Sequence, residues 1–257
     1  MKNKPGLRFA VIIPARYAST RFPGKALAMI GRKYMIQRVY EQAHKSVETV
    51  YIATDDQRIY DATTGFGGNA VFTSASHTSG TDRCAEAAKK IMAETGKKID
   101  VVINVQGDEP FIKPEQIDLL KSCFYDENVT LATLIRKTSA GEDIFNHDRP
   151  KVIVDVNSNA IYFSRTAVPF IRDHQPSQWT SLHSYFMHLG LYAYRSDVLQ
   201  KITLLPPSPL EKAESLEQNR WIENGYTIRC AETNWESFGI DTPEDLEKAI
   251  NMYERFI

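Results

Sequence analysis

The sequence predicts an α/β fold with a mixed, mostly parallel sheet flanked by helices. Residues 9–13 and 100–105 are continuous apolar runs rich in β-branched residues, which is typical of strands buried on both faces. Segments with helical spacing of apolar residues, beginning with 34–44, alternate with such runs. Short connections separate the segments, and this alternation indicates βαβ units.

The composition is that of a globular protein with almost no net charge. The chain has 257 residues, 42% hydrophobic and 25% charged, with 31 basic against 32 acidic residues and a formal net charge of -1. We therefore expect neither nucleic acid nor an anionic membrane as a partner. No window approaches the 18 or so consecutive apolar residues that a membrane span needs.

The cysteines and the N-terminal region predict a cytoplasmic protein. Cys84, Cys123 and Cys230 are widely separated and form no CxxC pair, which favours thiols in a reducing compartment. The first apolar run is short and is followed at once by Pro14 and Arg16, so it reads as a strand rather than a signal sequence.

The first half of the chain continues the alternation of strands and helices. Asp55 and Asp56 precede a helix that ends at a glycine-rich segment, 65–68. Residues 65–70, GFGGNA, loosely fit a dinucleotide-binding fingerprint, but they follow a predicted helix and precede a predicted strand. The fingerprint requires the reverse order, so we interpret the glycines as a helix end. The remaining predicted elements are strands at 49–54 and 70–73 and helices at 82–94 and 114–123.

From residue 130 the pattern becomes antiparallel. Strands are predicted at 130–135, 151–155, 160–163 and 186–194, with a hairpin turn at 157–159 and a proline-containing excursion at 165–180. Because the sequence contains neither an internal repeat nor a long linker, we predict a single domain over 1–257 with a hairpin-rich subdomain at about 138–194.

The last part of the chain returns to alternating helices and strands. A helix over 209–224 would place Glu214 and Gln218 on one face, four residues apart. A strand follows at 226–232. Thr242 and Pro243 then predict the start of a final helix, as N-cap and first helical residue.

Cationic side chains follow the first strand. Arg16, Arg21 and Lys25 lie within ten residues, beside the small residues Ala15 and Gly24 that let a ligand approach the backbone. In an open α/β sheet the ligand crevice lies beyond the carboxyl ends of the strands, so this loop suits a polyphosphate. The same spacing also fits a solvated basic loop.

Two aspartates are candidate magnesium ligands. Asp108 follows the strand at 100–105, and Asp241 directly precedes the final helix. Mg²⁺ takes one or two protein carboxylates and leaves positions for phosphate oxygens, which fits this pair. The alternatives are that Asp108 only bonds its own turn and that Asp241 only caps the helix.

Other common catalytic patterns are missing from the sequence. There is no GxxxxGK[ST] loop, because the pairs Gly24-Lys25 and Gly96-Lys97 are followed by other residues. GxSxG, HExxH and zinc-type cysteine pairs are also absent. The chain therefore offers cations and carboxylates but no marked nucleophile or catalytic histidine.

Five separated blocks resemble the 3-deoxy-manno-octulosonate cytidylyltransferase family in order and spacing: IIPARYASTRFPGK at 12–25, NVQGDEP at 104–110, HLGLYAY at 188–194, ESLEQ at 214–218 and GIDTPEDLE at 239–247. The resemblance covers residues 9–249. It implies a nucleotide-diphospho-sugar transferase type of fold, with the antiparallel insertion used for homodimerisation. It also implies an enzyme that activates 3-deoxy-D-manno-octulosonate (Kdo) with CTP, giving CMP-Kdo and pyrophosphate for lipopolysaccharide biosynthesis.

The resemblance also implies roles for individual residues. Arg16, Lys25, Asp108 and Asp241 match catalytic positions, and the two aspartates match ligands of a catalytic Mg²⁺. The positions matching the CTP site are Ala15, Arg21, Ser79, Gly80 and Thr81. Those matching the sugar site are Arg83, Gln106, His188, Tyr192, Glu217 and Gln218. From the residues alone, Arg83 could lie on a helix surface, Gln106 could bond a strand end, and His188 and Tyr192 could be core residues.

The reaction implied is an in-line displacement in which the anomeric hydroxyl of Kdo attacks the α-phosphorus of CTP. The nearest rivals are CMP-sialate synthesis and transfer to an 8-amino Kdo analogue. A dinucleotide-dependent oxidoreductase would need glycines where this chain has PARYAST, and a nucleotide-binding regulatory protein would have no reason to keep both Asp108 and Asp241. Departures from the family pattern are small: Ala26 replaces a frequent proline and Asn219 a leucine.

Overall fold

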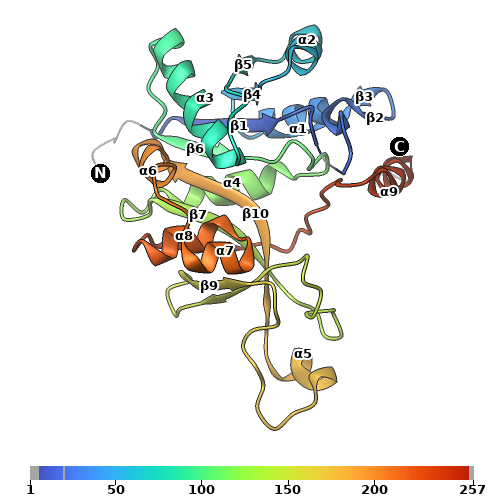
Figure 1. The fold of residues 1–257 in the computed structure, drawn as a ribbon, viewed down its shortest axis with the longest axis vertical. Coiled ribbons are helices and arrows are strands. Elements are labelled where there is room, and N and C mark those ends of the chain that lie inside the picture. The colour runs from blue at the N-terminus through green and yellow to red at the C-terminus, as the bar shows by residue number, and fades with distance from the viewer. Residues whose placement is uncertain (1–5, 20, 255–257) are drawn as a thin grey trace. The chain divides into compact units, whose positions relative to one another are not determined.

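The computed structural model describes residues 6–19 and 21–254. It separates into two compact units, one formed by residues 1–118, 194–203 and 237–257 and the other by 119–193 and 204–236 (Figure 1). The predicted subdomain at 138–194 falls almost wholly within the second unit. The prediction of a single domain and that of dimerisation by the insertion stay predictions. The first five residues of the N-terminal region lie outside the described ranges, as does Thr20 of the cationic loop.

The first unit contains a parallel sheet built around the first predicted strand. β1 (Phe9–Ala15) pairs with β4 (Val50–Thr54) on one side and with β6 (Val101–Asn104) on the other, and β5 (Ala70–Phe72) pairs with β4. The residues Ala10 to Ile13 and Val101 to Ile103 are fully buried. This burial explains their continuous apolar sequence.

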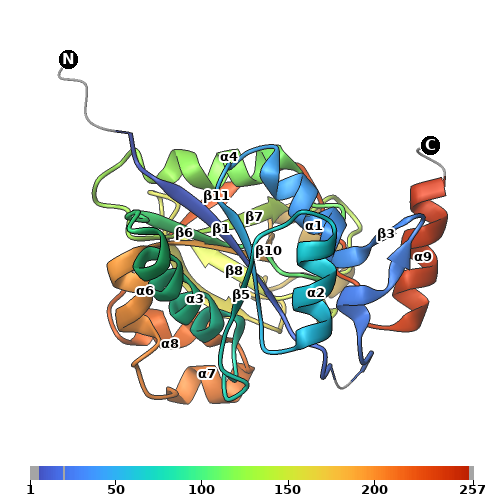
Figure 2. The ribbon, with the colours of Figure 1, turned by 90° about the horizontal axis from the view of Figure 1, so that it is seen from above.

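Helices cover both faces of this sheet. They are α1 (Met35–His44), α2 (Gln57–Gly65), α3 (Gly80–Thr95), the first half of α4 (Pro114–Cys123) and α6 (Ser196–Ile202). Figure 2 shows α3 and α6 together on one side of β1, with α1 on the other. A short 3₁₀ turn, η1 (Lys25–Leu27), and a hairpin of β2 (Met29–Ile30) and β3 (Lys33–Tyr34) connect β1 to α1. α9 (Pro243–Glu254) packs beside the short strand β2 of this hairpin.

The strand order in the first unit fixes where a ligand can bind. The order β6-β1-β4-β5 means that the chain moves outward from β1 in one direction and then returns to the other side of β1. The outward connection through α1 and the return connection through α3 therefore lie on opposite faces of the sheet (Figure 2). A crevice forms between two such connections at the carboxyl ends of the strands, which is where open α/β sheets bind their ligands.

The second unit has a mixed sheet, as the sequence predicts. β7 (Leu131–Lys137) lies between β10 (Phe186–Arg195) and β11 (Ile228–Glu232), and the β11–β7 pair is parallel. β8 (Lys151–Val154) pairs antiparallel with both β9 (Ala160–Ser164) and β10. The excursion at 165–180 contains the 3₁₀ turn η2 (Pro176–Gln178) and leads into α5 (Trp179–Leu182).

The predicted helix over 209–224 is wrong, because the structure has two helices there. α7 (Pro209–Glu214) and α8 (Glu217–Glu223) are separated by Ser215, whose φ of 51° lies in the left-handed region. The Glu214 carboxylate accepts hydrogen bonds from Tyr162, Ser164 and the Arg165 backbone, which ties the end of α7 to β9. Glu214 and Gln218 therefore do not share one helical face.

Two predicted boundaries also shift. β1 does not end before Pro14 but continues through Ala15, which pairs with Thr54, because only the proline N–H is lost from the ladder. α3 begins at Gly80 rather than at residue 82, so Gly80 and Thr81 lie in its first turn and Ser79 is its N-cap. The predicted start of the final helix is confirmed, since the Thr242 hydroxyl accepts from the Asp245 backbone N–H at 3.2 Å.

Within the described residues, no helix is long and apolar enough to cross a membrane.

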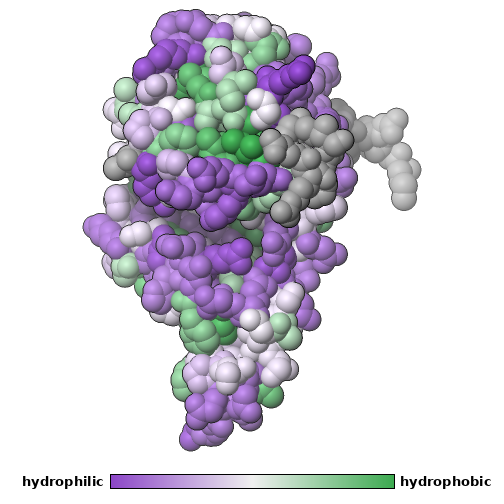
Figure 3. Space-filling model, turned by 90° about the vertical axis from the view of Figure 1, so that its right-hand side faces the viewer, coloured by the Kyte–Doolittle hydropathy of each residue, from purple (hydrophilic) through white to green (hydrophobic). Residues whose placement is uncertain are grey.

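Hydrophobic surface occurs around α5, where Phe170 is 73% exposed and Leu182 is 52% exposed. Figure 3 shows hydrophobic side chains among hydrophilic ones near the lower end of the molecule, which carries α5 in Figure 1.

Candidate active site

A polar pocket of about 410 Å³ lies in the first unit, where the connections after β1 and β6 meet. Its walls come from the loop after β1, the loop leading into α3, the turn after β6 and the segment before α9. The sequence-predicted residues that line it are Ala15, Arg16, Arg21, Lys25, Ser79, Gly80, Arg83, Gln106, Asp108 and Asp241. Neighbouring strands thus bring together the cationic loop and the carboxylate turn, as the sequence predicts.

Close backbone packing holds the turn after β6 against the end of β1. A Cβ added at Gly107 would lie 3.0 Å from the Pro14 carbonyl oxygen and 2.9 Å from Ile36 Cδ1, so no larger residue fits without displacement. Glycine at this position therefore sets how closely Asp108 approaches the cationic loop.

A backbone contact and an apolar cluster position Asp241 beside Asp108. The Ile240 N–H donates to the Asp108 carbonyl oxygen at 2.9 Å. Ile240 itself is fully buried in a cluster with Ile30, Met35 and Ala249 of α9. The aspartate before the final helix is thereby fixed to the turn after β6.

The Lys25 ammonium lies between the two aspartates. Its Nζ atom is 2.5 Å from Asp108 Oδ2, 3.0 Å from Asp241 Oδ1 and 3.1 Å from the Ile240 carbonyl oxygen. Burial opposes the charge on Lys25, but the attraction and hydrogen bonds of the two carboxylates outweigh it and raise the pKa of Lys25. All three ammonium protons are thus directed at protein oxygens.

The two arginines of the loop differ in their partners. Arg21 Nη2 lies 2.9 Å from Asp241 Oδ2, and the Arg21 side chain is 67% exposed. Arg16 is exposed and lines the pocket without an ion-pair partner in the described parts of the chain. Its guanidinium is therefore available to an anionic ligand.

A second carboxylate, Glu109, follows Asp108 and is buried. Burial raises the pKa of Glu109 to about 7, although the Ser237 hydroxyl donates a hydrogen bond to the carboxylate. The negative charge of Asp108 adds to this effect. The sequence does not identify Glu109, because the GDEP turn alone cannot show which of its two carboxylates points inward.

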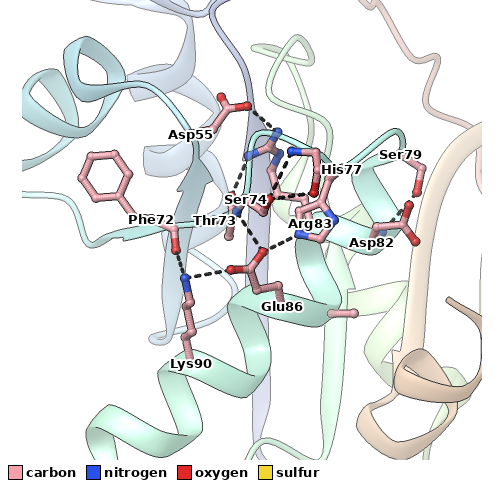
Figure 4. A network of polar contacts seen from close by, with 12 residues as sticks. Asp55, Phe72, Thr73, Ser74, His77, Ser79, Asp82, Arg83, Glu86 and Lys90 are labelled. Carbon is pink, nitrogen blue, oxygen red and sulfur yellow. Dashed lines mark hydrogen bonds and ion pairs between the residues drawn. The ribbon is translucent and has the colours of Figure 1, made fainter. Parts of the chain in front are cut away.

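Arg83 extends from α3 and is held on both sides. Its side chain is 5% exposed, with Nη2 2.9 Å from Asp55 Oδ2 and Nη1 donating to Thr73 Oγ1 at 2.6 Å (Figure 4). The helix-surface alternative for Arg83 is therefore wrong. Gln106 donates from Nε2 to Asn104 Oδ1 at 3.1 Å, so the strand-end hydrogen bond exists alongside its place in the pocket wall.

The structure does not place Thr81 among the lining residues of the pocket. Thr81 is 3% exposed in the first turn of α3. A wall residue that was left out of the predicted site is His77, which precedes Ser79 in the loop. The loop composition shows that its side chains can bind a ligand, but only the fold shows which of them face the pocket.

The remaining predicted residues lie in the second unit. The rings of His188 and Tyr192 are 5.2 Å apart, those of Tyr192 and Trp221 are 5.1 Å apart, and Phe163 contacts His188 with its ring centroid at 4.9 Å. His188 Nε2 lies 2.9 Å from the Thr133 hydroxyl. Loss of hydration lowers the pKa of His188 to about 3, so the imidazole is neutral at neutral pH.

Two further predicted residues lie on α8, the helix that also carries Trp221. Gln218 is 5% exposed, and its Nε2 has no hydrogen-bond partner within the described residues. A buried unsatisfied donor costs about 1 to 3 kcal/mol, and such an atom is a natural point for a ligand acceptor. Glu217 instead accepts from Arg220 Nη2 at 2.9 Å. Next to them, the fully buried Asn219 bonds the Phe163 backbone through both ends of its amide, which explains a polar residue at this position.

Comparison with known proteins gives matches over almost the whole chain. A family model described as cytidylyltransferase matches residues 10–238. A protein of Parabacteroides distasonis named 3-deoxy-manno-octulosonate cytidylyltransferase is 53% identical over 248 residues, covering 95% of this chain and 97% of that protein. A protein of Bacteroides thetaiotaomicron with the same name is 52% identical, with 95% and 97% coverage.

A solved structure agrees with these sequence matches. The structure of CMP:2-keto-3-deoxy-manno-octonic acid synthetase complexed with CTP superposes with a TM-score of 0.87 at 40% sequence identity. The match covers 97% of this chain and 100% of the other. The predicted α/β fold of nucleotide-diphospho-sugar transferase type is thereby confirmed.

Proposed function

This chain belongs to the 3-deoxy-manno-octulosonate cytidylyltransferase family, and we propose that it uses CTP to convert Kdo into CMP-Kdo with release of pyrophosphate. The observation that carries the proposal is the chain-long match to a solved synthetase complexed with CTP, at 40% identity and a TM-score of 0.87. The pocket between the β1 and β6 connections supports it, because it presents cations and carboxylates where an α/β sheet binds its ligand.

We also propose that the enzyme depends on Mg²⁺ held by Asp108 and Asp241. The residues fit such an ion, because oxygens of both carboxylates reach one and the same ammonium group, at 2.5 and 3.0 Å from Lys25 Nζ. A cation position between two carboxylates is thus built into the fold. The described residues offer no group of three or more His, Cys, Asp or Glu for a metal. Two carboxylates suit Mg²⁺, which keeps other positions for phosphate oxygens and water.

Lys25 must change partners for the metal and the nucleotide to bind. Its three donors are taken up by Asp108, Asp241 and the Ile240 carbonyl, so none is directed at a phosphate. A divalent cation between the carboxylates would compete with the ammonium for the same oxygens. Lys25 would then be free to neutralise charge on the triphosphate, near Arg16.

The reaction needs positioning and charge stabilisation more than proton transfer by the protein. The Kdo anomeric hydroxyl attacks the α-phosphorus, the bond to the β-phosphate oxygen breaks, and pyrophosphate leaves with additional negative charge. Arg16, Arg21 and Lys25 lie where they can bind these phosphate oxygens. Mg²⁺, when bound, supplies Lewis-acid polarisation and lowers the pKa of a coordinated hydroxyl. No protein base is then obligatory.

We propose sugar-binding roles, which the family resemblance implies, for two separate sets of residues. In the first unit, the buried guanidinium of Arg83 and the Gln106 amide line the pocket and suit an acid sugar. In the second, the free Nε2 donor of Gln218 suits a sugar hydroxyl, and Tyr192, Glu217 and the neutral His188 lie on the same two elements, β10 and α8. The family resemblance implies the cytosine end for Ser79, Gly80 and Thr81. Ser79 and Gly80 line the pocket and support this role, whereas Thr81 is buried outside its lining.

The cellular location and the oligomeric state of the enzyme are proposed from its cysteines and its exposed apolar side chains. The cysteines form no disulfide within the described residues and no CxxC pair, which supports a cytoplasmic location. CMP-Kdo is suited to lipopolysaccharide biosynthesis. We propose a homodimer, supported by the exposed Phe170 and Leu182 around α5. Sedimentation at micromolar concentration tests the dimer, and monomer alone would contradict it.

Pyrophosphate release tests the proposed reaction. The protein is incubated with Mg²⁺, each of the four nucleoside triphosphates and a panel of acid sugars that contains Kdo, its 8-amino analogue and a sialic acid. We expect release with CTP and Kdo, and at least a ten-fold lower rate with the other sugars. Faster release with the 8-amino sugar or the sialic acid would favour the corresponding rival reaction, and no release with any pair would refute the proposal.

A further inference from the structure

One face of α3 holds the loop that precedes it. Arg83, Glu86 and Lys90 follow one another at intervals of three and four residues, so their side chains share a helical face. Figure 4 shows Arg83 and Glu86 directed toward the loop of residues 73–79, and Lys90 toward Phe72 just before it. Arg83 binds Thr73 at the beginning of this loop, and Ser79 at its end caps the helix by accepting from the Asp82 N–H at 3.1 Å.

Glu86 is the central residue of this face. The Ser74 backbone N–H donates to Glu86 Oε2 at 2.9 Å, and the His77 imidazole contacts the same oxygen through Nε2. On the other side, Lys90 Nζ lies 2.7 Å from Glu86 Oε1 and donates to the Phe72 carbonyl at 2.8 Å. One carboxylate thus joins the loop to the helix at two points, Ser74 and His77, while Lys90 of the same helix holds its other oxygen.

The charge of Glu86 sets the orientation of His77. Partial burial works against ionisation, but the hydrogen bonds from Lys90, Ser74 and His77 outweigh it and lower the pKa of Glu86 to about 2. An ionised carboxylate only accepts hydrogen bonds, so the Nε2 of His77 is the donor. A histidine held in this way keeps one ring orientation, with Nε2 as the donor.

His77 faces the pocket, whereas Glu86 does not. His77, Thr78 and Ser79 all line the pocket, and Glu86 is absent from its wall. These three residues offer an imidazole, hydroxyls and backbone groups but no lysine or arginine. They therefore suit the base and ribose of a nucleotide, whereas the cationic loop suits its phosphates.

We propose that Glu86 is a positioning residue for the nucleotide, which fixes His77 and the 73–79 loop as the wall that contacts the base and ribose. This inference rests on the proposed function, in that it takes CTP as the nucleotide. A wall that is ordered before binding reduces the conformational entropy that the ligand would otherwise have to overcome. Glu86 acts on CTP only through the loop, so its loss weakens nucleotide binding without touching the reacting atoms.

Glu86→Gln is the sharpest variant. The amide keeps the size of the side chain and retains an oxygen that can accept from the Ser74 N–H, but it removes the charge that orients His77. We expect the Kd of CTP, measured by calorimetry without sugar, to rise by about ten-fold. The KM for CTP rises in parallel, while kcat and the KM for Kdo stay within about two-fold.

Two further variants complete the experiment. Glu94→Gln makes the same chemical change at an exposed position of the same helix and leaves the Kd of CTP unchanged. His77→Ala weakens CTP binding about as much as Glu86→Gln, and the double variant is no weaker than His77→Ala alone, because both act through one contact. His77→Ala gives the same readout if Glu86→Gln proves unable to fold.

Several outcomes would overturn the inference. One is an unchanged Kd of CTP in both Glu86→Gln and His77→Ala. Another is an equal loss of affinity for CTP and for Kdo. The third is a double variant whose increase in the Kd of CTP is the product of the two single increases. A wild-type protein that binds CTP but releases no pyrophosphate would refute the proposed function alone, since the Kd comparison would still hold. A wild-type protein that binds no CTP would refute both.

Discussion

The two groups of site residues differ in how their polar groups are satisfied. In the first unit, Lys25 and Arg21 pair with Asp108 and Asp241 in a pocket open enough to leave Asp241 43% exposed. In the second unit, His188 is a neutral imidazole among aromatic rings, and the Gln218 amide is buried with an unsatisfied donor. Lys25, Arg21 and the two aspartates are thus charges with partners, whereas His188 and Gln218 are neutral groups fixed by packing.

This difference separates two ways of preparing a site. A paired charge can exchange one partner for another of the same sign. A metal ion can thus replace lysine beside the carboxylates, and a polyphosphate can replace the carboxylates beside lysine, so that no charge is left uncompensated. Neutral buried groups cannot rearrange in this way, and they select a ligand by whether it completes their hydrogen bonds. We therefore expect mutations in the first group to affect turnover and those in the second to affect sugar recognition.

Asp108→Asn should have the largest effect. It keeps the shape of the side chain but removes one of the two charges proposed to hold Mg²⁺, so we expect kcat to fall by about 10³-fold. Steady-state pyrophosphate release measures the loss, and circular dichroism checks that the fold is intact. A folded variant with near-normal kcat would disprove the metal assignment.

Lys25→Met should separate metal binding from turnover. With the ammonium gone, a divalent cation no longer competes for the two carboxylates, so we expect Mn²⁺ to bind about ten-fold more tightly in the absence of nucleotide. Turnover should nevertheless fall by about 10²-fold, because a cation for the triphosphate is lost. Electron paramagnetic resonance of free Mn²⁺ gives the affinity. Weaker Mn²⁺ binding in this variant would show that Lys25 does not occupy the metal position.

Gln218→Met tests the second group. Because the Nε2 donor has no partner in the described structure, its removal should leave the melting temperature unchanged or slightly higher. If the donor serves a sugar hydroxyl, the KM for Kdo should rise by about ten-fold while the KM for CTP stays within two-fold. An unaltered KM for Kdo would remove Gln218 from the sugar site.

His188 should give the smallest effect, seen as a dependence of stability on pH. Its pKa is lowered to about 3 in the folded protein, against about 6.5 in an unfolded chain. As the pH falls, the unfolded chain therefore takes up a proton at a higher pH than the folded protein does. The stability that the neutral imidazole contributes is complete above pH 6.5 and is lost as the pH falls toward 3. Thermal melts of wild type and His188→Gln between pH 7.5 and 4.5 measure this, with a shallower slope expected for the variant. Identical slopes would indicate that His188 titrates normally.

The local sequence was sufficient to predict the elements that flank the site. The apolar run of β1 and the capping residue Thr242 each act within a few residues, and the structure confirms both. The placement of Arg16 and Lys25 after one parallel strand and of Asp108 after another predicted that they would meet at one edge of the sheet, as they do. Helical periodicity failed at Ser215, where long-range bonds of Glu214 to β9 end the helix.

Only the tertiary structure decided which of these groups contact one another. Lys25 meets Asp108 and Asp241 across 83 and 216 residues of sequence, and no local pattern fixes such distances. The pairing of Glu86 with His77, the burial of Glu109 and the unsatisfied amide of Gln218 are likewise invisible in the sequence. Propensity and capping depend on neighbours along the chain, whereas ion pairing and desolvation depend on which surfaces the whole chain brings together.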